Sequence, residues 1–317
     1  MSSLTRSETA RWLRDHDNFL ILTHRRPDGD TVGSAAALCR GLRTLGKNAH
    51  VLRNMEITDK YRHLHQDLYQ DCPESGNAII SVDVATPHLL PDVFSHLARH
   101  VRLRIDHHRT DIPFAPLELV DADAGSCGEI VYDVLQELGV ALDVPMAEAL
   151  YTAISTDTGC FRYANTTAHT FRVAAACAEA GGDLHSINQR IFETNSLGRL
   201  RLQGWIVENI RFLCDGKAAV CALPMDVERQ LGLTEDDLEN ISGFPRSIEG
   251  VCIAATLRQS SDGSIKISVR ALPGYDAAAV CAKFGGGGHK GAAGATVKAQ
   301  LEEAAAMISM ELEKLLG

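Results

Sequence analysis

Aspartate and histidine side chains gather in four short segments of this 317-residue chain, each where a predicted strand or helix ends. The four segments are 21-ILTHRRPDGDTVGSAAAL-38, 79-IISVD-83, 102-RLRIDHH-108 and 155-STDTGCFRYANTT-167. Carboxylate oxygens and imidazole nitrogens without thiolates favour manganese or magnesium over structural zinc. The pattern therefore predicts metal chemistry, provided that folding brings the four segments together.

Each segment taken alone also has an ordinary explanation. Asp30 stands where an aspartate commonly caps a helix, and loop Asp-Gly pairs are common turn material. At one edge of a sheet, however, the four carboxylates would repel one another unless a cation intervened. They belong to Asp28, Asp30, Asp83 and Asp157. Two divalent ions balance these charges, and a pair about 3.5 to 4 Å apart would generate a hydroxide that attacks phosphorus. We expect Mn²⁺, with Mg²⁺ or Co²⁺ as alternatives.

Strands must carry these segments to a common edge. The predicted strands are 18–23, 49–53, 78–84 and 101–106, and the predicted helices between them are 31–46 and 91–99. Strands that alternate with helices imply an α/β fold with a mostly parallel sheet and helices on both faces. Ligands of such a sheet gather past the carboxyl ends of its strands, which is where the acidic and histidine segments fall.

A change in sequence character predicts two domains with the active-site cleft between them. We expect a larger α/β domain at 1–190, a helical connector at 191–214 and a smaller domain of sheet and helices at 215–317. Helical periodicity continues through 126–139, 146–155 and 167–181, and a polar helical passage spans 186–213. In the smaller domain, Asp-Gly pairs at 215–216 and 262–263 predict hairpin turns.

Composition limits the classes of protein and partner. The chain is 45% hydrophobic and 23% charged, as in ordinary globular proteins, and no apolar run is long enough to cross a bilayer. Nine cysteines without a CxxC pair argue against a disulfide framework and, with a charged N-terminus unlike a secretory signal, favour the cytoplasm. A net charge of -10 argues against long duplex DNA but not against short nucleotides.

The ordered segments HRRPDGD, SVD, DHH and STDTG resemble the motifs of the DHH phosphoesterase family over nearly the whole chain. The resemblance implies the following metal ligands: His24 and Asp28 for one ion, Asp30, His107 and Asp157 for the other, and Asp83 as the bridge. It also implies that Asp106 orients the site from behind and that His108 lies close to the scissile phosphate. All positions of the pattern are filled, which favours an active enzyme.

A glycine-rich segment, 284-FGGGGHKGAAGA-295, marks the smaller domain. It contains a formal G-x-G-x-x-G match, but a dinucleotide fingerprint follows a strand, and the preceding 276–284 predicts a helix. A flexible linker is the plain alternative. His289 and Lys290, placed before small residues that begin a predicted helix, favour an anion-binding loop. The loop resembles the GGGH motif of the DHH-associated C-terminal domain, which implies that Gly286, Gly287, Gly288 and His289 contact the substrate.

Three arginines are further candidates for substrate binding. Arg270, in 267-ISVRAL-272, matches the arginine that family members place on the neighbouring strand to hold phosphate, and a guanidinium suits bidentate phosphate contact. Arg109 and Arg162 are weaker candidates, because an ordinary role as surface charge explains each of them equally well.

Two domains and this chain length resemble the branch of the family that trims very short RNAs and removes the 3'-phosphate of 3'-phosphoadenosine-5'-phosphate (pAp). The expected enzyme is a hydrolase that acts through a hydroxide bridging two metals, on short RNA or a mononucleotide, with a homodimer left open. The alternatives are a cyclic di-AMP or pApA phosphodiesterase and a type II inorganic pyrophosphatase or exopolyphosphatase-like enzyme. A non-catalytic nucleotide sensor is the alternative from a different class.

Overall fold

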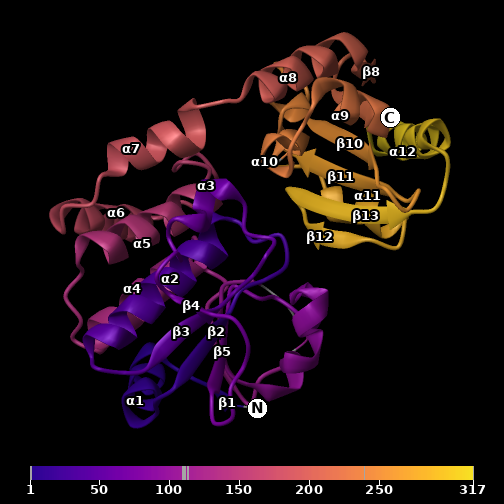
Figure 1. The fold of residues 1–317 in the computed structure, drawn as a ribbon. Helices are drawn as coiled ribbons and strands as arrows, with labels where there is room; N and C mark the ends of the chain where they lie inside the picture. The colour runs from indigo at the N-terminus through magenta and orange to yellow at the C-terminus, as the bar shows by residue number, and fades with distance from the viewer. Residues whose placement is uncertain (1, 109–111, 113, 239, 317) are drawn as a thin grey trace. The chain divides into compact units, whose positions relative to one another are not determined.

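The computed structural model describes residues 2–108, 112, 114–238 and 240–316. The chain folds into two compact units, which meet in the sequence between Thr194 and Asn195 (Figure 1). Each unit has its own sheet and its own buried core. No helix in the described part of the chain combines the length and apolar character that a bilayer-spanning segment needs.

The first unit contains a seven-stranded sheet in the order β1-β7-β6-β5-β2-β3-β4, and all of its strand pairs are parallel. The strands are β1 (Ser2–Ser3), β2 (Phe19–Leu22), β3 (Ala49–Leu52), β4 (Tyr69–Gln70), β5 (Ala78–Val82), β6 (Val101–Asp106) and β7 (Leu117–Val120). The predicted parallel α/β sheet is confirmed. The structure adds β1, β4 and β7, which the sequence did not predict.

Strand order reverses between β2 and β5. The chain passes from β2 to β3 and β4 on one side, then returns to place β5 directly beside β2 and continues through β6 and β7. Ligands of open α/β sheets bind outside the carboxyl ends of the strands at such a reversal. His24 and Asp83 follow β2 and β5, so the topology places them at this point.

Helices cover both faces of the sheet. They are α1 (Arg6–Asp15), α2 (Gly29–Thr44), α3 (Asp59–Arg62), η1 (Pro87–Leu89), η2 (Asp92–His100), α4 (Cys127–Glu137), α5 (Val144–Asp157), α6 (Ala168–Glu179), α7 (Leu184–Asn188) and the π-helix η3 (Gln189–Glu193). The predicted helix at 91–99 is the 3-10 helix η2. Helix α2 packs closely on α5 because Gly33 lacks a side chain: a Cβ there would lie 2.2 Å from the Ala149 carbonyl oxygen.

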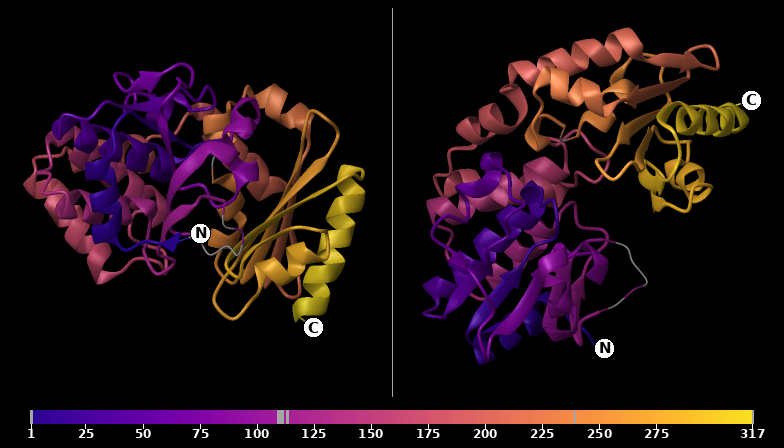
Figure 2. Two further views of the ribbon diagram at one scale, coloured as in Figure 1. Left: turned by 90° about the horizontal axis from the view of Figure 1, so that it is seen from below. Right: turned by 45° about the vertical axis from the view of Figure 1, so that its right-hand side comes forward.

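The second unit contains a six-stranded mixed sheet in the order β12-β13-β11-β10-β9-β8. Its strands are β8 (Arg211–Leu213), β9 (Ala218–Leu223), β10 (Ile253–Gln259), β11 (Ile265–Ala271), β12 (Gly287–His289) and β13 (Ala292–Val297). Its helices are α8 (Leu197–Asn209), α9 (Met225–Leu231), α10 (Glu235–Leu238), η4 (Ile241–Gly243), η5 (Pro245–Ser247), α11 (Ala277–Ala282) and α12 (Leu301–Leu316). Figure 2 shows α12 lying along one face of this sheet, where Ile308 and Leu312 are buried in the core.

The polar passage at 186–213, predicted as a helical connector, consists of several elements. Helical structure is interrupted between Glu193 and Leu197, and the passage ends in strand β8. Helix α8 belongs to the second unit, where Leu202 and Ile206 are fully buried against its sheet. These two apolar side chains, four residues apart on one face of the helix, explain why α8 packs there.

The prediction that a helix begins after Lys290 is wrong. The glycine-rich segment is a β-hairpin in which β12 pairs with β13. Glycine allows the two backbones to approach closely: a Cβ on Gly286 would lie 2.1 Å from the Gly294 carbonyl oxygen, and Gly288 has φ 144°. The small residues after the loop therefore serve strand contact rather than helix formation.

Candidate metal centre

The six side chains expected to hold metal ions lie together at the carboxyl edge of the first sheet. Their ligand atoms form groups in which all atoms lie within 4.8 Å of one another. The groups are His24, Asp28 and Asp83; Asp30, His107 and Asp157; and Asp83, His107 and His108. The first two groups are the two ligand sets that the sequence resemblance implied. The resemblance also implies that Asp83 contacts the second ion, and the third group places Asp83 beside His107.

Asp83 stands between the two sets. Its Oδ2 lies 3.6 Å from His24 Nε2, and its Oδ1 lies 3.5 Å from His107 Nε2. The backbone of Asp83 is left-handed, with φ 59°, and the residue is 2% exposed. A non-glycine residue held in this conformation at the end of a strand is characteristic of functional sites.

The residues present fit a pair of divalent cations. Asp83 Oδ1 and His107 Nε2 are buried and have no hydrogen-bond partner within the part of the chain that the structure describes. A buried carboxylate oxygen and a buried imidazole nitrogen facing each other without hydrogen bonds are unfavourable unless a further group binds both. Oxygen and nitrogen donors at this spacing suit a divalent ion.

The charges of the cluster also favour bound divalent cations. Burial and the neighbouring Asp83 raise the pKa of Asp30 well above its ordinary value, and the pKa of Asp157 is raised for the same two reasons. Burial opposes the charged form of His24, but Asp28 and Asp83 outweigh it and raise its pKa. Without cations the cluster therefore retains protons, and bound cations would displace them.

Helix N-termini position two of the carboxylates. Asp28 caps α2, and its Oδ1 accepts the backbone N–H groups of Asp30 and Thr31 at 3.0 and 3.2 Å. Asp30 itself is therefore not the cap. Its carboxylate accepts the N–H groups of Cys127 and Gly128 at 2.7 and 2.9 Å, at the start of α4, whose dipole favours negative charge there.

Asp106 fixes the orientation of His107 and His108, the two histidines that follow it in the chain. Its Oδ1 accepts the backbone N–H of His107 at 2.8 Å and the Nδ1–H of His108 at 2.8 Å. Burial disfavours the charged forms, but the pairing with Asp106 and Asp83 raises the pKa of His108 to about 11, and the pKa of Asp106 is lowered to about 2. Because Nδ1 of His108 donates to a carboxylate, its Nε2 is the atom available to other groups.

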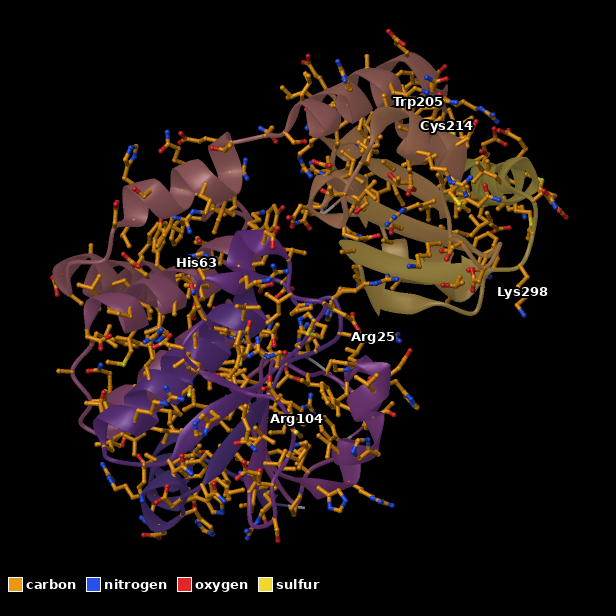
Figure 3. All side chains as sticks on the ribbon, in the orientation of Figure 1. Arg25, His63, Arg104, Trp205, Cys214 and Lys298 are labelled. Atoms are coloured by element: carbon orange, nitrogen blue, oxygen red, sulfur yellow. The ribbon has the colours of Figure 1, made fainter. Side chains whose placement is uncertain are left out.

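Behind Asp106 lies Arg104, which the sequence analysis missed. Arg104 is 1% exposed and donates through Nε (3.1 Å) and Nη2 to Asp106 Oδ2, inside the first unit (Figure 3). Its register partner Glu118 on β7 lies 3.5 Å from Nη1, and the Phe114 ring centroid lies 5.5 Å from the guanidinium carbon. The signal was present in the sequence: an arginine two residues before an aspartate on one strand shares its face.

Asn165 is a second positioning residue that the sequence analysis missed. Its Nδ2 donates to the Gly125 carbonyl at 2.7 Å, and to the backbone carbonyl and Oδ2 of Asp157 at 3.2 and 3.3 Å. It thereby fixes the carboxylate that faces His107 Nε2 at 3.6 Å. Residues that hydrogen-bond to a metal ligand, without contacting the metal themselves, orient that ligand. Its position, eight residues beyond Asp157 in a loop, gave no periodic signal.

The second unit brings Arg270 and His289 to one face of its sheet. Both residues are register partners of Ala292, Arg270 on β11 and His289 on β12. Register partners on neighbouring strands point to the same face, so the two side chains stand about 10 Å apart, two strand spacings. Gly287 faces Gly294 in the next row, and a Cβ on Gly287 would meet nothing within 4 Å. Ala292 stands between the two basic side chains, and the two glycines leave the adjoining row of this face without side chains.

The remaining predicted site residues are two glycines of the hairpin and two arginines. Gly286 and Gly288 contact the β13 backbone, as described above. Arg162 is exposed, and its Nε donates to the Gly159 carbonyl. Arg109 lies outside the described residues.

Known proteins resemble this chain over most of its length. Residues 18–154 match the DHH family N-terminal domain, and residues 215–314 match the DHHA1 domain. The bifunctional oligoribonuclease and PAP phosphatase NrnA of Thermus thermophilus is 33% identical, over 88% of this chain and 83% of that protein. NrnA of Bacillus subtilis is 27% identical, over 92% and 93% of the two chains. The crystal structure of an exopolyphosphatase-related protein from Bacteroides fragilis has a TM-score of 0.88 at 25% identity, covering 98% and 97%.

Fold and site together define a metal-dependent phosphoesterase, a hydrolase. The chain belongs to the DHH family, with an N-terminal DHH domain and a C-terminal DHHA1 domain. The resemblance predicted from the four motifs is thereby confirmed.

Proposed function

We propose that this chain hydrolyses very short oligoribonucleotides and removes the 3'-phosphate of pAp, with two Mn²⁺ ions at the cluster. The two NrnA relatives are named for both activities, and the match covers most of their length. One observation carries the proposal: the two carboxylate oxygens of Asp83 face two different histidines, at 3.6 and 3.5 Å. A two-metal phosphoesterase needs such a shared ligand.

We assign His24 and Asp28 to one ion, Asp30, His107 and Asp157 to the other, and Asp83 to both. Two divalent ions, when bound, supply a hydroxide nucleophile and stabilise negative charge on the phosphoryl oxygens. Asp106 keeps Nδ1 of His108 protonated, so Nε2 of His108 is the atom that contacts the scissile phosphate or gives a proton to the departing oxygen. Arg104 holds Asp106 in place for this task.

The sheet face between Arg270 and His289 binds the part of the substrate remote from the metals. Two basic side chains on one face suit a phosphate, and Gly287 and Gly294 in the adjoining row leave room for a flat nucleoside. We assign Gly286, Gly287 and Gly288 to this face as the backbone that forms it. Arg109 and Arg162 are proposed as additional phosphate contacts on the first unit.

A substrate panel tests the proposal. Protein freed of metal by chelation and reloaded with Mn²⁺ is given a diribonucleotide, pAp, pApA, cyclic di-AMP and pyrophosphate, and the products are separated by chromatography. We expect hydrolysis of the diribonucleotide and of pAp, and none before Mn²⁺ is restored. Turnover of pyrophosphate alone would identify a pyrophosphatase instead, and nucleotide binding without turnover would favour a sensor.

We also propose that the protein works in the cytoplasm. All nine cysteines are free, and five of them are buried. Burial raises the pKa of the thiols of Cys39 and Cys177 to about 12, so they stay neutral and unreactive. Free thiols in this number suit a reducing compartment.

A further inference from the structure

The loop that follows Asp157 has an unusual backbone. Gly159, Cys160 and Phe161 are successive residues with φ 58°, 57° and 63°. Residues with a side chain enter the left-handed region singly and at a cost, so Cys160 and Phe161 in succession after the glycine are rare. Such conformations persist only where surrounding contacts impose them, and they concentrate at functional sites.

Contacts on both sides hold this turn in place. The Cys160 N–H donates to the Ser155 carbonyl at 2.6 Å, and the Arg162 and Tyr163 N–H groups both donate to the Thr158 carbonyl at 3.0 Å. The Phe161 ring is stacked on Phe171, with centroids 5.3 Å apart. The turn is therefore a fixed part of the first unit rather than a loose connection.

The turn places the ring of Tyr163 against the backbone of Gly159. A Cβ on Gly159 would lie 2.3 Å from Tyr163 Cζ, so only glycine leaves room for the ring. Tyr163 is nonetheless 54% exposed. Two residues further on, Asn165 returns to the carboxylate of Asp157. The segment that carries this solvent-exposed ring therefore begins directly after Asp157 and returns to it through the hydrogen bond of Asn165.

We propose that Tyr163 is the surface on which a nucleobase of the substrate stacks, on a nucleoside flanking the scissile phosphate. This inference rests on the proposed function. Stacking on an aromatic ring accepts every base, because every base has a π face, and it suits an enzyme that must bind short RNA of any sequence. A phosphate or pyrophosphate substrate would gain nothing from such a ring.

A cycle of variants and substrate analogues tests the proposal. The substrates are a diadenylate and two analogues in which the base of one nucleoside or of the other is replaced by hydrogen, all with Mn²⁺. For the wild type, loss of the stacked base should lower kcat/KM about ten- to hundredfold, mainly through KM. Tyr163→Ala should lower kcat/KM on the diadenylate by a similar factor, and loss of that same base should then cost the variant nothing further.

Two variants serve as controls. Tyr163→Phe retains the ring and should keep the wild-type dependence on the base. Phe212→Ala removes an aromatic side chain of similar exposure, 50%, from β8 of the second unit and should also keep it. A Tyr163→Ala protein that still loses as much as the wild type when a base is removed would overturn the assignment. A wild type that hydrolyses none of the three compounds would overturn the proposed function itself.

Discussion

The left-handed backbone of Asp83 limits what can replace it. Asparagine tolerates this conformation and has the same shape, so Asp83→Asn removes charge without disturbing the end of β5. Both proposed ions depend on this side chain, so we expect Mn²⁺ affinity and turnover to fall by more than about 100-fold. That factor is the largest usual loss when a residue that only hydrogen-bonds to a metal ligand is replaced. Calorimetric titration with Mn²⁺ measures the first, and the diribonucleotide assay the second.

A matched control for Asp83→Asn is Asp92→Asn, since the Asp92 side chain is 96% exposed and 3.9 Å from Arg25. Asp92→Asn should bind Mn²⁺ as the wild type does. Normal Mn²⁺ affinity in Asp83→Asn would contradict the bridging role.

Arg104 and Asp106 form a buried ion pair, which makes Arg104 sensitive to replacement. Arg104→Met leaves Oδ2 of the buried Asp106 carboxylate without its cationic partner, and we expect the free energy of unfolding to fall by about 3 to 5 kcal/mol. Urea unfolding at pH 7 measures this loss. Arg102, an exposed arginine two residues earlier on β6, provides the comparison: Arg102→Met should change stability little. Equal stability of the two variants would show that the pair contributes nothing.

At the scale of elements, the strands that carry the site were predictable, and the elements that brace it were not. β2 and β5 are almost wholly apolar, as expected of strands buried on both faces, and β6 alternates apolar and charged residues, so their ends and the side chains beyond them could be located. β1 and β4 have two residues each, too few for any periodic signal.

The second unit was less predictable, for a physical reason. Glycine is compatible with loops, turns and closely paired strands, so a glycine-rich sequence does not distinguish an anion-binding loop from the β12–β13 hairpin. The pairing depends on β11 and β13, which are distant contacts that no local pattern contains. For the same reason Asn165 and the α4 N–H groups that hold Asp30 were found only in the structure.

The β12–β13 hairpin makes a steric prediction. Gly287 is not in the left-handed region and has open space where a Cβ would lie, so Gly287→Val should fold normally while its side chain stands beside His289 on the face that carries Arg270. We expect KM for pAp to rise at least about tenfold, the effect of losing about 1.4 kcal/mol of binding, with kcat little changed. Steady-state kinetics measures both constants.

Gly204 on α8 offers the matched control. A Cβ there also meets nothing within 4 Å, and Gly204→Ala should stabilise the helix by about 1 kcal/mol without altering KM. An unchanged KM in Gly287→Val would remove this sheet face from the substrate site.

The packing of His65 on α2 predicts a pH dependence of stability. Nε2 of His65 donates to the Val32 carbonyl at 2.7 Å, and burial lowers the pKa of His65 to about 4. The unfolded chain binds this proton near pH 6.5, so the stabilisation is complete above pH 6.5 and is lost as pH falls towards 4, by about 3 kcal/mol in all. In urea unfolding between pH 7.5 and 4.5, His65→Gln should lose that part of the slope.

The exposed His96 supplies the reference for this measurement. His96→Gln should keep the wild-type slope between pH 7.5 and 4.5. A His65→Gln protein whose stability falls with acid as steeply as that of the wild type would show that His65 titrates normally.

At the scale of the whole molecule, the two units have separate cores, and all proposed metal ligands belong to the first. Only the first unit should therefore gain stability from metal. A ligand that binds only the folded state stabilises it by about 2.7 kcal/mol at 100 times its dissociation constant, so saturating Mn²⁺ should raise one thermal transition and leave the other in place. Differential scanning calorimetry, with chelator and with Mn²⁺, resolves the two. Gly204→Ala raises only the transition of the second unit and so identifies it. A uniform shift of both transitions would show that the two units unfold together.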